Sequence, residues 1–307
     1  MHLFLPIAGT SINLLIPFGL GGLVGFMSGM FGVGGGFLMT PLLMMVGIPP
    51  TVAAATDSCQ IAAASASGTF AHARMGNVDY KLGGLMLVGG IGGGAIGVHI
   101  IKALRQMGNA DFLIMVTYVI VLGLIGAYMF TESLAALRGK RKAPAKDRKR
   151  SWIAQLLVRL PFQMDFPKSG IRHSAFVPIA LCALVGILAA IMGVGGGFVM
   201  IPAMVYLLRM PMHVAVGTDL FQILFTASGV TFMQASVNHT VDFLLAVVLA
   251  LGSTVGAQIG ARVARRLRGE QLRIILSCVV LVVCVKMLYG LVANPELLLS
   301  YATKGGH

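Results

Sequence analysis

Long apolar stretches separated by short polar breaks run through almost the whole chain, without the alternating polar period of a membrane β-strand. In the first half they predict helices over residues 14–31, 37–46, 51–74, 82–104 and 112–131. In the second half they predict helices over residues 176–192, 198–208, 212–235, 243–264 and 272–292. Residues 1–13 are apolar but interrupted by Pro6 and Gly9, and we expect them at a membrane interface.

A helix needs about 20 residues to cross the hydrocarbon core of a bilayer. The helices predicted over 37–46 and 198–208 are too short for this. The glycine run before each of them, Gly32–Gly36 and Gly193–Gly197, therefore indicates a break within the membrane. Each half then consists of a glycine-broken helical hairpin and three full transmembrane helices.

The two glycine runs belong to an internal duplication. Gly32–Phe37 and Gly193–Phe198 are identical in sequence and begin 161 residues apart, at positions 32 and 193. With one residue inserted, the duplication pairs Leu23–Gly25 with Leu184–Gly186, Met39 with Met200, Pro41 with Pro202, Pro49 with Pro211, Thr56–Asp57 with Thr218–Asp219, Gln60–Ile61 with Gln222–Ile223, and Thr69–Phe70 with Thr231–Phe232.

The composition identifies an all-α integral membrane protein. Of the 307 residues, 57% are hydrophobic and 11% are charged, and the mean hydropathy is +0.89, whereas a soluble domain has about 25% charged residues. The formal net charge of +13 does not indicate nucleic-acid binding, because the basic residues cluster between the apolar segments. That distribution is typical of cytoplasmic loops under the positive-inside rule.

Residues 138–175 are predicted to form a basic cytoplasmic linker between a first transmembrane repeat, 1–137, and a second, 176–307. Within this linker, the stretch 152–160 suits an interfacial amphipathic helix. A second basic cluster at 262–273 should lie on the same side of the membrane. This requires the broken hairpin of the second half to enter and leave on one side, and applying the same rule to the first half predicts that the two repeats are inverted.

The glycine breaks are the first candidate binding site. Backbone that lacks helical hydrogen bonds is found in the membrane only where protein or a water-filled cavity surrounds it. Each run leads into the N-terminus of a half-helix, whose partial positive charge favours anions. Two such ends could meet near the midplane and bind a small oxyanion; alternatively, the glycines only permit close helix crossing. The candidate substrate-binding glycines are Gly34, Gly35, Gly36, Gly195, Gly196 and Gly197.

The paired Thr-Asp-x-x-Gln segments are the second candidate. Asp and Gln at i and i+3 share one helix face, and Thr56, Gln60, Thr218 and Gln222 are further candidate substrate-binding residues. Asp57 and Asp219 could accept hydrogen bonds from the broken-helix amides, could carry a coupling proton in their neutral form, or could bind a cation such as sodium.

Other polar groups indicate less. Asp79 lies in the loop after the predicted helix 51–74, where we expect a solvated helix end. His99 has no partner at metal-ligand spacing, and neither a Ser/His/Asp set nor an HExxH motif is present in the sequence. No catalytic residue, metal site or cofactor is therefore predicted.

These residues resemble the sulfite exporter TauE/SafE family of bacterial membrane proteins. The resemblance covers nearly the whole chain outside the linker and rests on Gly25 and Pro41 around the first glycine run, Gly186 and Pro202 around the second, and the Gly76–Asp79 loop. The acids at 57 and 219 depart from the pattern usual in that family. The resemblance implies a transporter of sulfite, sulfonates or related small sulfur anions, largely in export.

We therefore predict a multi-pass secondary transporter of the bacterial inner membrane, which moves a small sulfur-containing anion by alternating access at a midplane site. Two alternatives remain open: a proton- or sodium-coupled carrier that imports a different small organic anion, and an anion channel. The expected partners are the anion, the lipid bilayer and a coupling proton, and not nucleic acid. The sequence does not define the oligomeric state.

Overall fold

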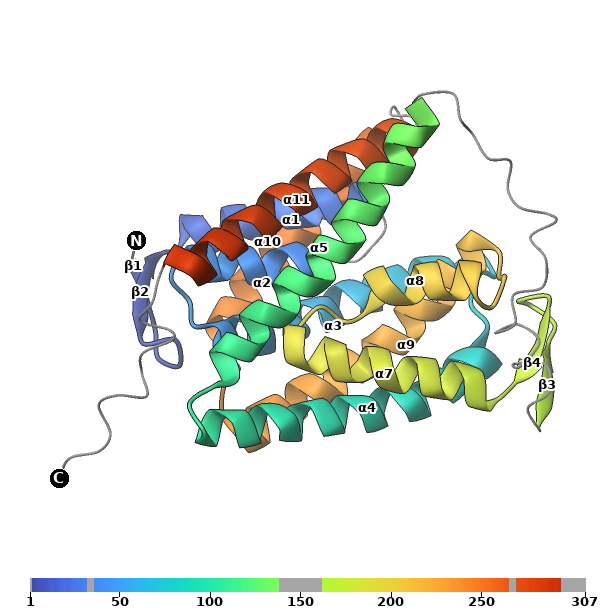
Figure 1. Cartoon of the computed structure of the whole chain (residues 1–307), viewed down its shortest axis with the longest axis horizontal. Coiled ribbons are helices and arrows are strands. Elements are labelled where there is room, and N and C mark those ends of the chain that lie inside the picture. The colour runs from blue at the N-terminus through green and yellow to red at the C-terminus, as the bar shows by residue number, and fades with distance from the viewer. Residues whose placement is uncertain (1, 32–35, 138–161, 265–268, 294–307) are drawn as a thin grey trace.

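The computed structural model describes residues 2–31, 36–137, 162–264 and 269–293, and this part of the chain is mostly helical (Figure 1). Its first half contains β1 (His2–Leu5), β2 (Thr10–Asn13), α1 (Leu15–Phe31), α2 (Gly36–Met45), α3 (Pro50–Arg74), α4 (Tyr80–Gln106) and α5 (Ala110–Leu137). Its second half contains β3 (Gln163–Phe166), β4 (Ile171–Ser174), α7 (Phe176–Met192), α8 (Gly197–Tyr206), α9 (Met212–Met233) with the π-helical turn η1 (Gln234–Asn238), α10 (Phe243–Ala264) and α11 (Gly269–Ala293).

All ten predicted α-helices are confirmed. The bounds of α7 and α10 are those expected from the sequence, and the other helices differ by a few residues at their ends. The start of α4 moves from Leu82 to Tyr80 because Asp79 caps this helix: its Oδ1 accepts a hydrogen bond from the Leu82 amide at 3.1 Å. The interfacial helix predicted within 152–160 lies outside the described residues.

Two β-hairpins were not predicted. β1 pairs with β2, and β3 pairs with β4, in antiparallel register. In both hairpins a glycine amide closes the turn, from Gly9 to the Leu5 carbonyl and from Gly170 to the Phe166 carbonyl, each at 2.9 Å. Both turns contain Pro-x-x-Gly, at positions 6–9 and 167–170, so the duplication extends to the first residues of the chain.

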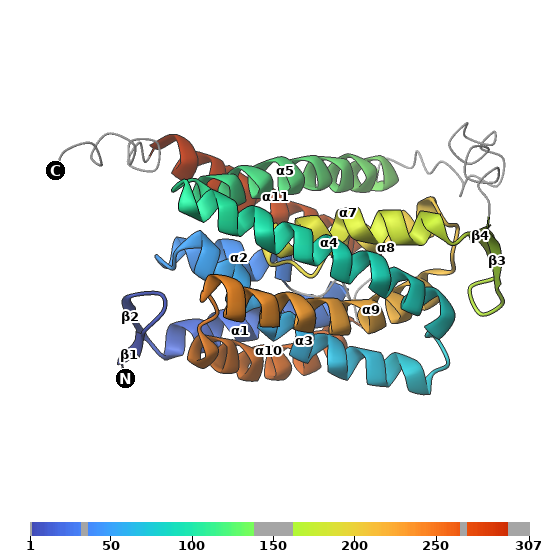
Figure 2. The same ribbon diagram turned by 90° about the horizontal axis from the view of Figure 1, so that it is seen from below.

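The helices of the two halves pack against each other in matched pairs. α1 packs against α10, α7 packs against α4, α3 crosses α9, and α5 lies beside α11. Figure 2 shows α2 and α8 in the middle of the molecule, with α5 and α11 on one side of them and α1 and α10 on the other. The two half-helices that follow the glycine runs therefore lie at the centre of the helix assembly.

Glycines at every fourth position make two of these contacts close. On α4, a Cβ at Gly89, Gly93 or Gly97 would overlap backbone atoms of α7. On α10, a Cβ at Gly252, Gly256 or Gly260 would overlap backbone atoms of α1. Small residues at this spacing let helix backbones approach in membranes. The same device thus brings α4 close to α7 and α10 close to α1.

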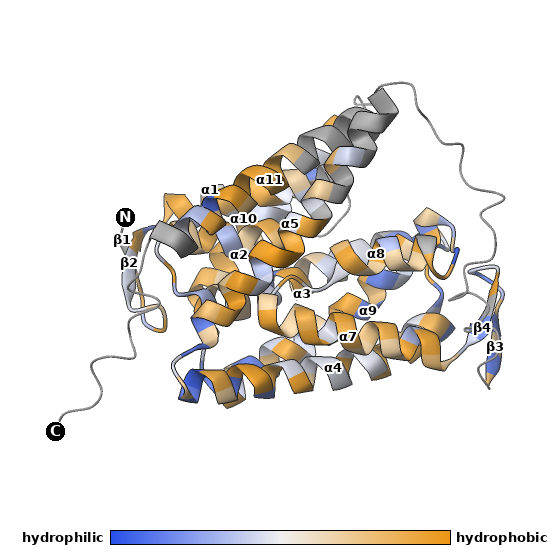
Figure 3. Ribbon diagram, in the orientation of Figure 1, coloured by the Kyte–Doolittle hydropathy of each residue, from blue (hydrophilic) through white to orange (hydrophobic). Residues whose placement is uncertain are grey.

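The surface of the helices suits a lipid environment. Figure 3 shows apolar residues along the length of the helices and hydrophilic residues concentrated at β3–β4 and at the ends of helices. Large apolar side chains such as Leu124, Val282 and Phe232 are exposed. Among the described residues, 80–106, 212–238 and 243–260 are long and apolar enough to cross a membrane, and five shorter helices are also apolar.

The hairpins mark opposite ends of the molecule. Figure 1 shows β1–β2 at the left end and β3–β4 at the right end. Because each hairpin leads directly into a helix, α1 and α7 start at opposite ends. Figure 1 also shows α5 and α11 side by side and running in opposite directions, so that the end of α5 and the start of α11 lie at the same end.

Candidate functional site

The second glycine break has a backbone that suits glycine at each of its bends. α7 ends at Gly193, which has φ 74° and whose amide donates to the Ala189 carbonyl at 2.7 Å. Gly195 has φ 70°, and Gly196, the residue before α8, has φ 82°. Residues with a Cβ rarely adopt this left-handed region. The repeated glycines therefore specify the break itself.

The start of α8 carries backbone amides that bind no carbonyl of the described residues. No described carbonyl accepts a hydrogen bond from the amides of Gly195, Gly197 or Phe198, whereas those of Val199 and Met200 already bind the Gly196 carbonyl. Unpaired amides at a helix N-terminus carry a partial positive charge and bind anions. The break therefore offers donors without offering a cationic side chain.

The two halves meet at this break. A Cβ at Gly193 would overlap the backbone of Ala54 in α3, and Gly195 lies against Ile61 of α3 and Ile223 of α9. Gly34 and Gly35 lie outside the described residues, but Gly36 at the start of α2 lies against the Val194 carbonyl. The rings of Phe37 and Phe198, which follow the two runs, stack with centroids 5.7 Å apart.

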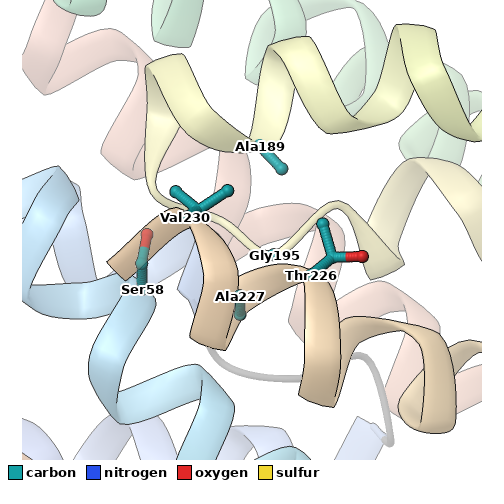
Figure 4. A pocket seen from close by; sticks show the side chains of 6 residues that line it. All are labelled: Ser58, Ala189, Gly195, Thr226, Ala227 and Val230. Carbon is teal, nitrogen blue, oxygen red and sulfur yellow. The ribbon is translucent and has the colours of Figure 1, made fainter. Parts of the chain in front are cut away.

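A small cavity lies beside the second break. It has a volume of about 10 Å³ and is lined by residues of α3, α7, α9 and the break: Ser58, Ala189, Gly195, Thr226, Ala227 and Val230 (Figure 4). This space holds about one water molecule. In this conformation the cavity is therefore too small for an oxyanion such as sulfite, and anion binding there would require α3, α7 or α9 to move.

The paired Thr-Asp-x-x-Gln segments lie where α3 crosses α9. Thr56, Asp57, Gln60 and their counterparts in α9 are all buried, with exposed fractions of at most 3%. Polar groups at such depth are expected to have hydrogen-bond partners. The partners found in the structure separate the roles of threonine, glutamine and aspartate.

The two threonines join the halves of the molecule. The hydroxyl oxygen of Thr56 accepts a hydrogen bond from the Asp242 amide at 3.1 Å, and that of Thr218 accepts one from the Asp79 amide at 3.0 Å. Asp242 in turn accepts from the Leu245 amide at the start of α10, as Asp79 does at the start of α4. Each half thus supplies a threonine that satisfies the helix start of the other half.

The tips of the β-hairpins complete this arrangement. Ser169 in the β3–β4 turn donates to Asp79 Oδ2 at 2.6 Å, and the Ile7 amide in the β1–β2 turn donates to Asp242 Oδ2 at 3.4 Å. Asp79 is 3% exposed. The expectation of a solvated helix end at Asp79 is therefore wrong, because the hairpin covers it.

Replacing either threonine by valine should destabilise the protein. In Thr56→Val or Thr218→Val the shape is nearly kept but a buried backbone amide loses its acceptor, which costs about 1–3 kcal/mol. We expect a lower unfolding temperature in detergent for both variants. Thr254→Val is the matched control, because the Thr254 hydroxyl is exposed and bonds only within its own helix, to Ala250. Equal effects in all three variants would contradict the role of the inter-half bonds.

The two glutamines have different partners. Gln60 Nε2 donates to Ser253 Oγ of α10 at 2.8 Å, whereas Gln222 Nε2 donates to Thr226 Oγ1 of its own helix at 2.8 Å. When the repeats are aligned on the helix starts at Asp79 and Asp242, the position of α4 that corresponds to Ser253 is Gly90, which has no side chain and lies against Gln222. Gln60 Oε1 has no described partner. The side-chain amides of the two glutamines can therefore still bind a ligand, and the groups beside them differ between the two halves.

The two acids also differ. Asp57 Oδ2 accepts a hydrogen bond from the Thr40 hydroxyl of α2 at 2.8 Å, and Asp57 Oδ1 has no partner among the described residues. No described residue donates a hydrogen bond to Asp219. Of the roles predicted for these acids, hydrogen bonding to a broken-helix amide has support among the described residues at Asp57, where the Thr40 backbone of α2 also contacts the carboxyl group.

Residues around the acids were missed at the sequence level. Thr40 contacts both Asp57 and Tyr118, and the Tyr118 hydroxyl donates to the Met192 carbonyl at 2.5 Å, directly before the second break. Asp242 was missed as well, although it corresponds to Asp79 once a second residue is inserted in the second half, which changes the spacing of the duplication from 162 to 163. The repeat spacing could have revealed Asp242, but nothing in the sequence places Tyr118 beside the break.

Comparisons with known proteins agree with the resemblance described above. The sequence model of the sulfite exporter TauE/SafE family matches residues 17–287. The chain is 26% identical over 288 residues to "Probable membrane transporter protein YunE" of Bacillus subtilis, covering 91% of this chain and 98% of that protein. It is 29% identical over 283 residues to "Probable membrane transporter protein YjnA" of the same organism, covering 91% and 100%.

A shorter segment is similar to plant proteins. Over 63 residues, or 20% of this chain and 13% of the relative, it is 43% identical to "Sulfite exporter TauE/SafE family protein 6" of Arabidopsis thaliana. No solved structure matches the chain significantly.

Proposed function

The chain belongs to the sulfite exporter TauE/SafE family of membrane transporters, and we propose that it is a secondary carrier of a small sulfur-containing anion such as sulfite or a sulfonate. The family and the apolar helices make it a multi-pass membrane protein. The substrate class is supported by the words "sulfite exporter" in the family description and by the chemistry of the second glycine break. Its helix-start amides, which bind no described carbonyl, suit a compact oxyanion.

The carrier works by alternating access between two inverted repeats. Support comes from α1 and α7, which start at opposite ends of the molecule, and from the matched pairing of α1 with α10 and α7 with α4. Discontinuous helices between inverted repeats are a recurrent plan for midplane binding sites. The cavity beside Gly195 is closed to an anion in this conformation, so a carrier would need to open it towards one side at a time.

The protein lies in the bacterial inner membrane with its basic linker in the cytoplasm. The linker follows α5, and the basic cluster at 262–273 adjoins the start of α11. The end of α5 and the start of α11 lie at the same end of the molecule (Figure 1). Both clusters would therefore face the cytoplasm, as the positive-inside rule favours.

Export is the direction that the membrane potential favours for an anion. An inside-negative potential contributes about 2.3 kcal/mol per charge and per 100 mV to the exit of a negative charge. Export therefore needs no coupling ion, whereas uptake of an anion against the potential needs one. The buried acids Asp57 and Asp219 are the observation that favours the second candidate function, a coupled importer of a small organic anion.

Flux measurements in proteoliposomes test the proposal. We expect saturable movement of sulfite or a sulfonate that is absent from protein-free liposomes. Flux that rises linearly with concentration, with open-pore conductance, would indicate an anion channel instead. Transport of carboxylates with no flux of any sulfur anion would favour the importer, and no flux of any anion would overturn the proposed function.

A further inference from the structure

We propose that the two buried acids have different roles: Asp219 takes up and releases a proton during each transport cycle, and Asp57 is a fixed structural carboxyl group. This inference rests on the proposed transport function and adds its coupling ion. The sequence presents the acids as equivalents within a duplication. Their surroundings in the structure are not equivalent.

Asp57 lies in a line of polar contacts that spans both halves. The Thr40 hydroxyl donates to its Oδ2 at 2.8 Å, Thr40 also contacts Tyr118, and the Tyr118 hydroxyl donates to the Met192 carbonyl at 2.5 Å. Met192 is the last residue of α7, directly before Gly193. Asp57 therefore ties α2, α3 and α5 to the second break, which is a positional role that it can keep throughout a cycle.

Asp219 lacks such support. Its exposed fraction is 1%, its Oδ1 has no partner, and no described side chain or amide donates to the carboxyl group. In the duplication, the position that corresponds to Thr40 is Ile201, which lies on α8 and has no hydroxyl. The carboxylate form of Asp219 would thus be a buried charge without a counter-charge or a donor.

The groups that face Asp219 do not supply a positive charge. Among the described residues, the Cys182 thiol of α7 is the titratable group that interacts with the Asp219 carboxyl group. No basic side chain of the described residues interacts with it. Asp57, on the crossing helix α3, interacts with Tyr118 of α5 instead. An uncompensated charge at this depth is strongly unfavourable. In the closed conformation, Asp219 is therefore the neutral acid.

Opening the site changes this balance. Asp219 lies on α9, as do Thr226, Ala227 and Val230 of the closed cavity, so movement of α9 that admits water also changes the surroundings of the acid. With water present, the carboxyl O–H bond can break, leaving a carboxylate and giving the proton to water as hydronium. The reverse step must precede closure. A proton thus crosses the membrane with the anion in the closed, anion-loaded state, because a neutral acid does not repel the anion. Net coupling also requires that the empty carrier return with Asp219 deprotonated, so water must stay beside the carboxylate during the return step.

Accumulation of the anion in proteoliposomes at zero potential tests the inference. For one proton per anion, a pH difference of one unit should change the equilibrium anion ratio across the membrane by about tenfold. Asp219→Asn should abolish this pH-driven accumulation while still exchanging labelled for unlabelled anion. Asp57→Asn should keep the pH-driven accumulation, whatever its rate, as should the control Asp111→Asn, whose carboxylate caps Thr51 at the start of α3.

The chain also supplies a reciprocal pair of variants. Ile201→Thr places a hydroxyl donor at the position of α8 that corresponds to Thr40, the donor to Asp57. This donor favours the carboxylate form of Asp219, so the pH profile of transport should move to lower pH. Thr40→Val removes the donor of Asp57 and should leave the profile in place. Elution as a single species and an unfolding temperature near that of the wild type exclude simple misfolding.

The outcomes separate this inference from the proposed function. If the wild type transports but ignores the pH gradient, or if Asp219→Asn keeps pH-driven accumulation, the inference is overturned while transport stands. If Asp57→Asn alone abolishes the accumulation, the two acids have the opposite assignment and the inference also fails. If no anion moves in the wild type, the proposed function fails first.

Discussion

Gly193→Ala is expected to abolish transport and to destabilise the folded protein by about 2–5 kcal/mol. The left-handed backbone of this residue, with φ 74°, costs a residue with a Cβ about 1–2 kcal/mol, and overpacking adds about 1–3 kcal/mol. The added Cβ would overlap the carbonyl oxygen, Cα and carbonyl carbon of Ala54. Because these are backbone atoms of α3, rotation of a side chain cannot relieve the overlap, and either α3 or the break must shift.

Gly170→Ala is the matched control. Gly170 in the β3–β4 turn has a similar backbone, with φ 65°, but a Cβ there would have no heavy atom within 4 Å. It should therefore show only the conformational cost, about 1–2 kcal/mol. Thermal unfolding in detergent and flux in proteoliposomes measure both effects. If Gly193→Ala is as mild as Gly170→Ala, the close approach of the break to α3 is not a property of the folded protein.

The helices could be predicted from the sequence because long apolar stretches mark them clearly. Apolar stretches are bounded by glycine, proline or charge, and the bounds of α7 and α10 follow directly from them. The β-hairpins could not be predicted in the same way, because strands of four residues are too short to show a clear alternation of apolar and polar positions. The duplication contained the missing information, since Pro6 and Gly9 recur as Pro167 and Gly170.

The site residues could be found by the duplication, but their roles could not. The partners of Thr56 and Thr218 are amides 186 and 139 residues away along the chain. Both amides belong to the opposite half. A pattern that compares one half with the other shows which positions are equivalent and says nothing about which positions touch. The inter-half bonds of the threonines therefore became visible only in the structure.

The differences between the halves carry as much information as the repeat. Thr40 corresponds to Ile201, and Gly90 corresponds to Ser253. Each exchange removes or adds one hydrogen-bonding group beside a buried acid or glutamine that both halves retain. A carrier with inverted halves can keep a symmetric frame for its movement while the chemistry at its centre becomes asymmetric. This is the physical basis for assigning one acid to structure and the other to the proton.

Gly93→Ala and Gly92→Ala, two adjacent changes on α4, are expected to have opposite effects. A Cβ at Gly93 would overlap the carbonyl oxygen, carbonyl carbon and Cα of Ala183 in α7, whereas a Cβ at Gly92 would have no heavy atom within 4 Å. Alanine favours a helix over glycine by about 1 kcal/mol. Gly92→Ala should therefore be neutral or slightly stabilising, and Gly93→Ala should lose about 1–3 kcal/mol to overpacking.

The pair also tests how α4 and α7 move during transport. If the two helices stay packed as one unit, Gly93→Ala should lower the unfolding temperature and leave the flux per folded protein nearly unchanged, because every conformation contains the strained contact. If the two helices slide apart in the open state, Gly93→Ala destabilises mainly the closed state. Exchange of labelled for unlabelled anion should then become faster, although the protein is less stable. Equal unfolding temperatures for Gly92→Ala and Gly93→Ala would contradict the contact itself.

The same comparison can be repeated in the other half with Gly256→Ala, whose Cβ would overlap the Gly22 carbonyl of α1. A matching result there would extend the contact to the second helix pair.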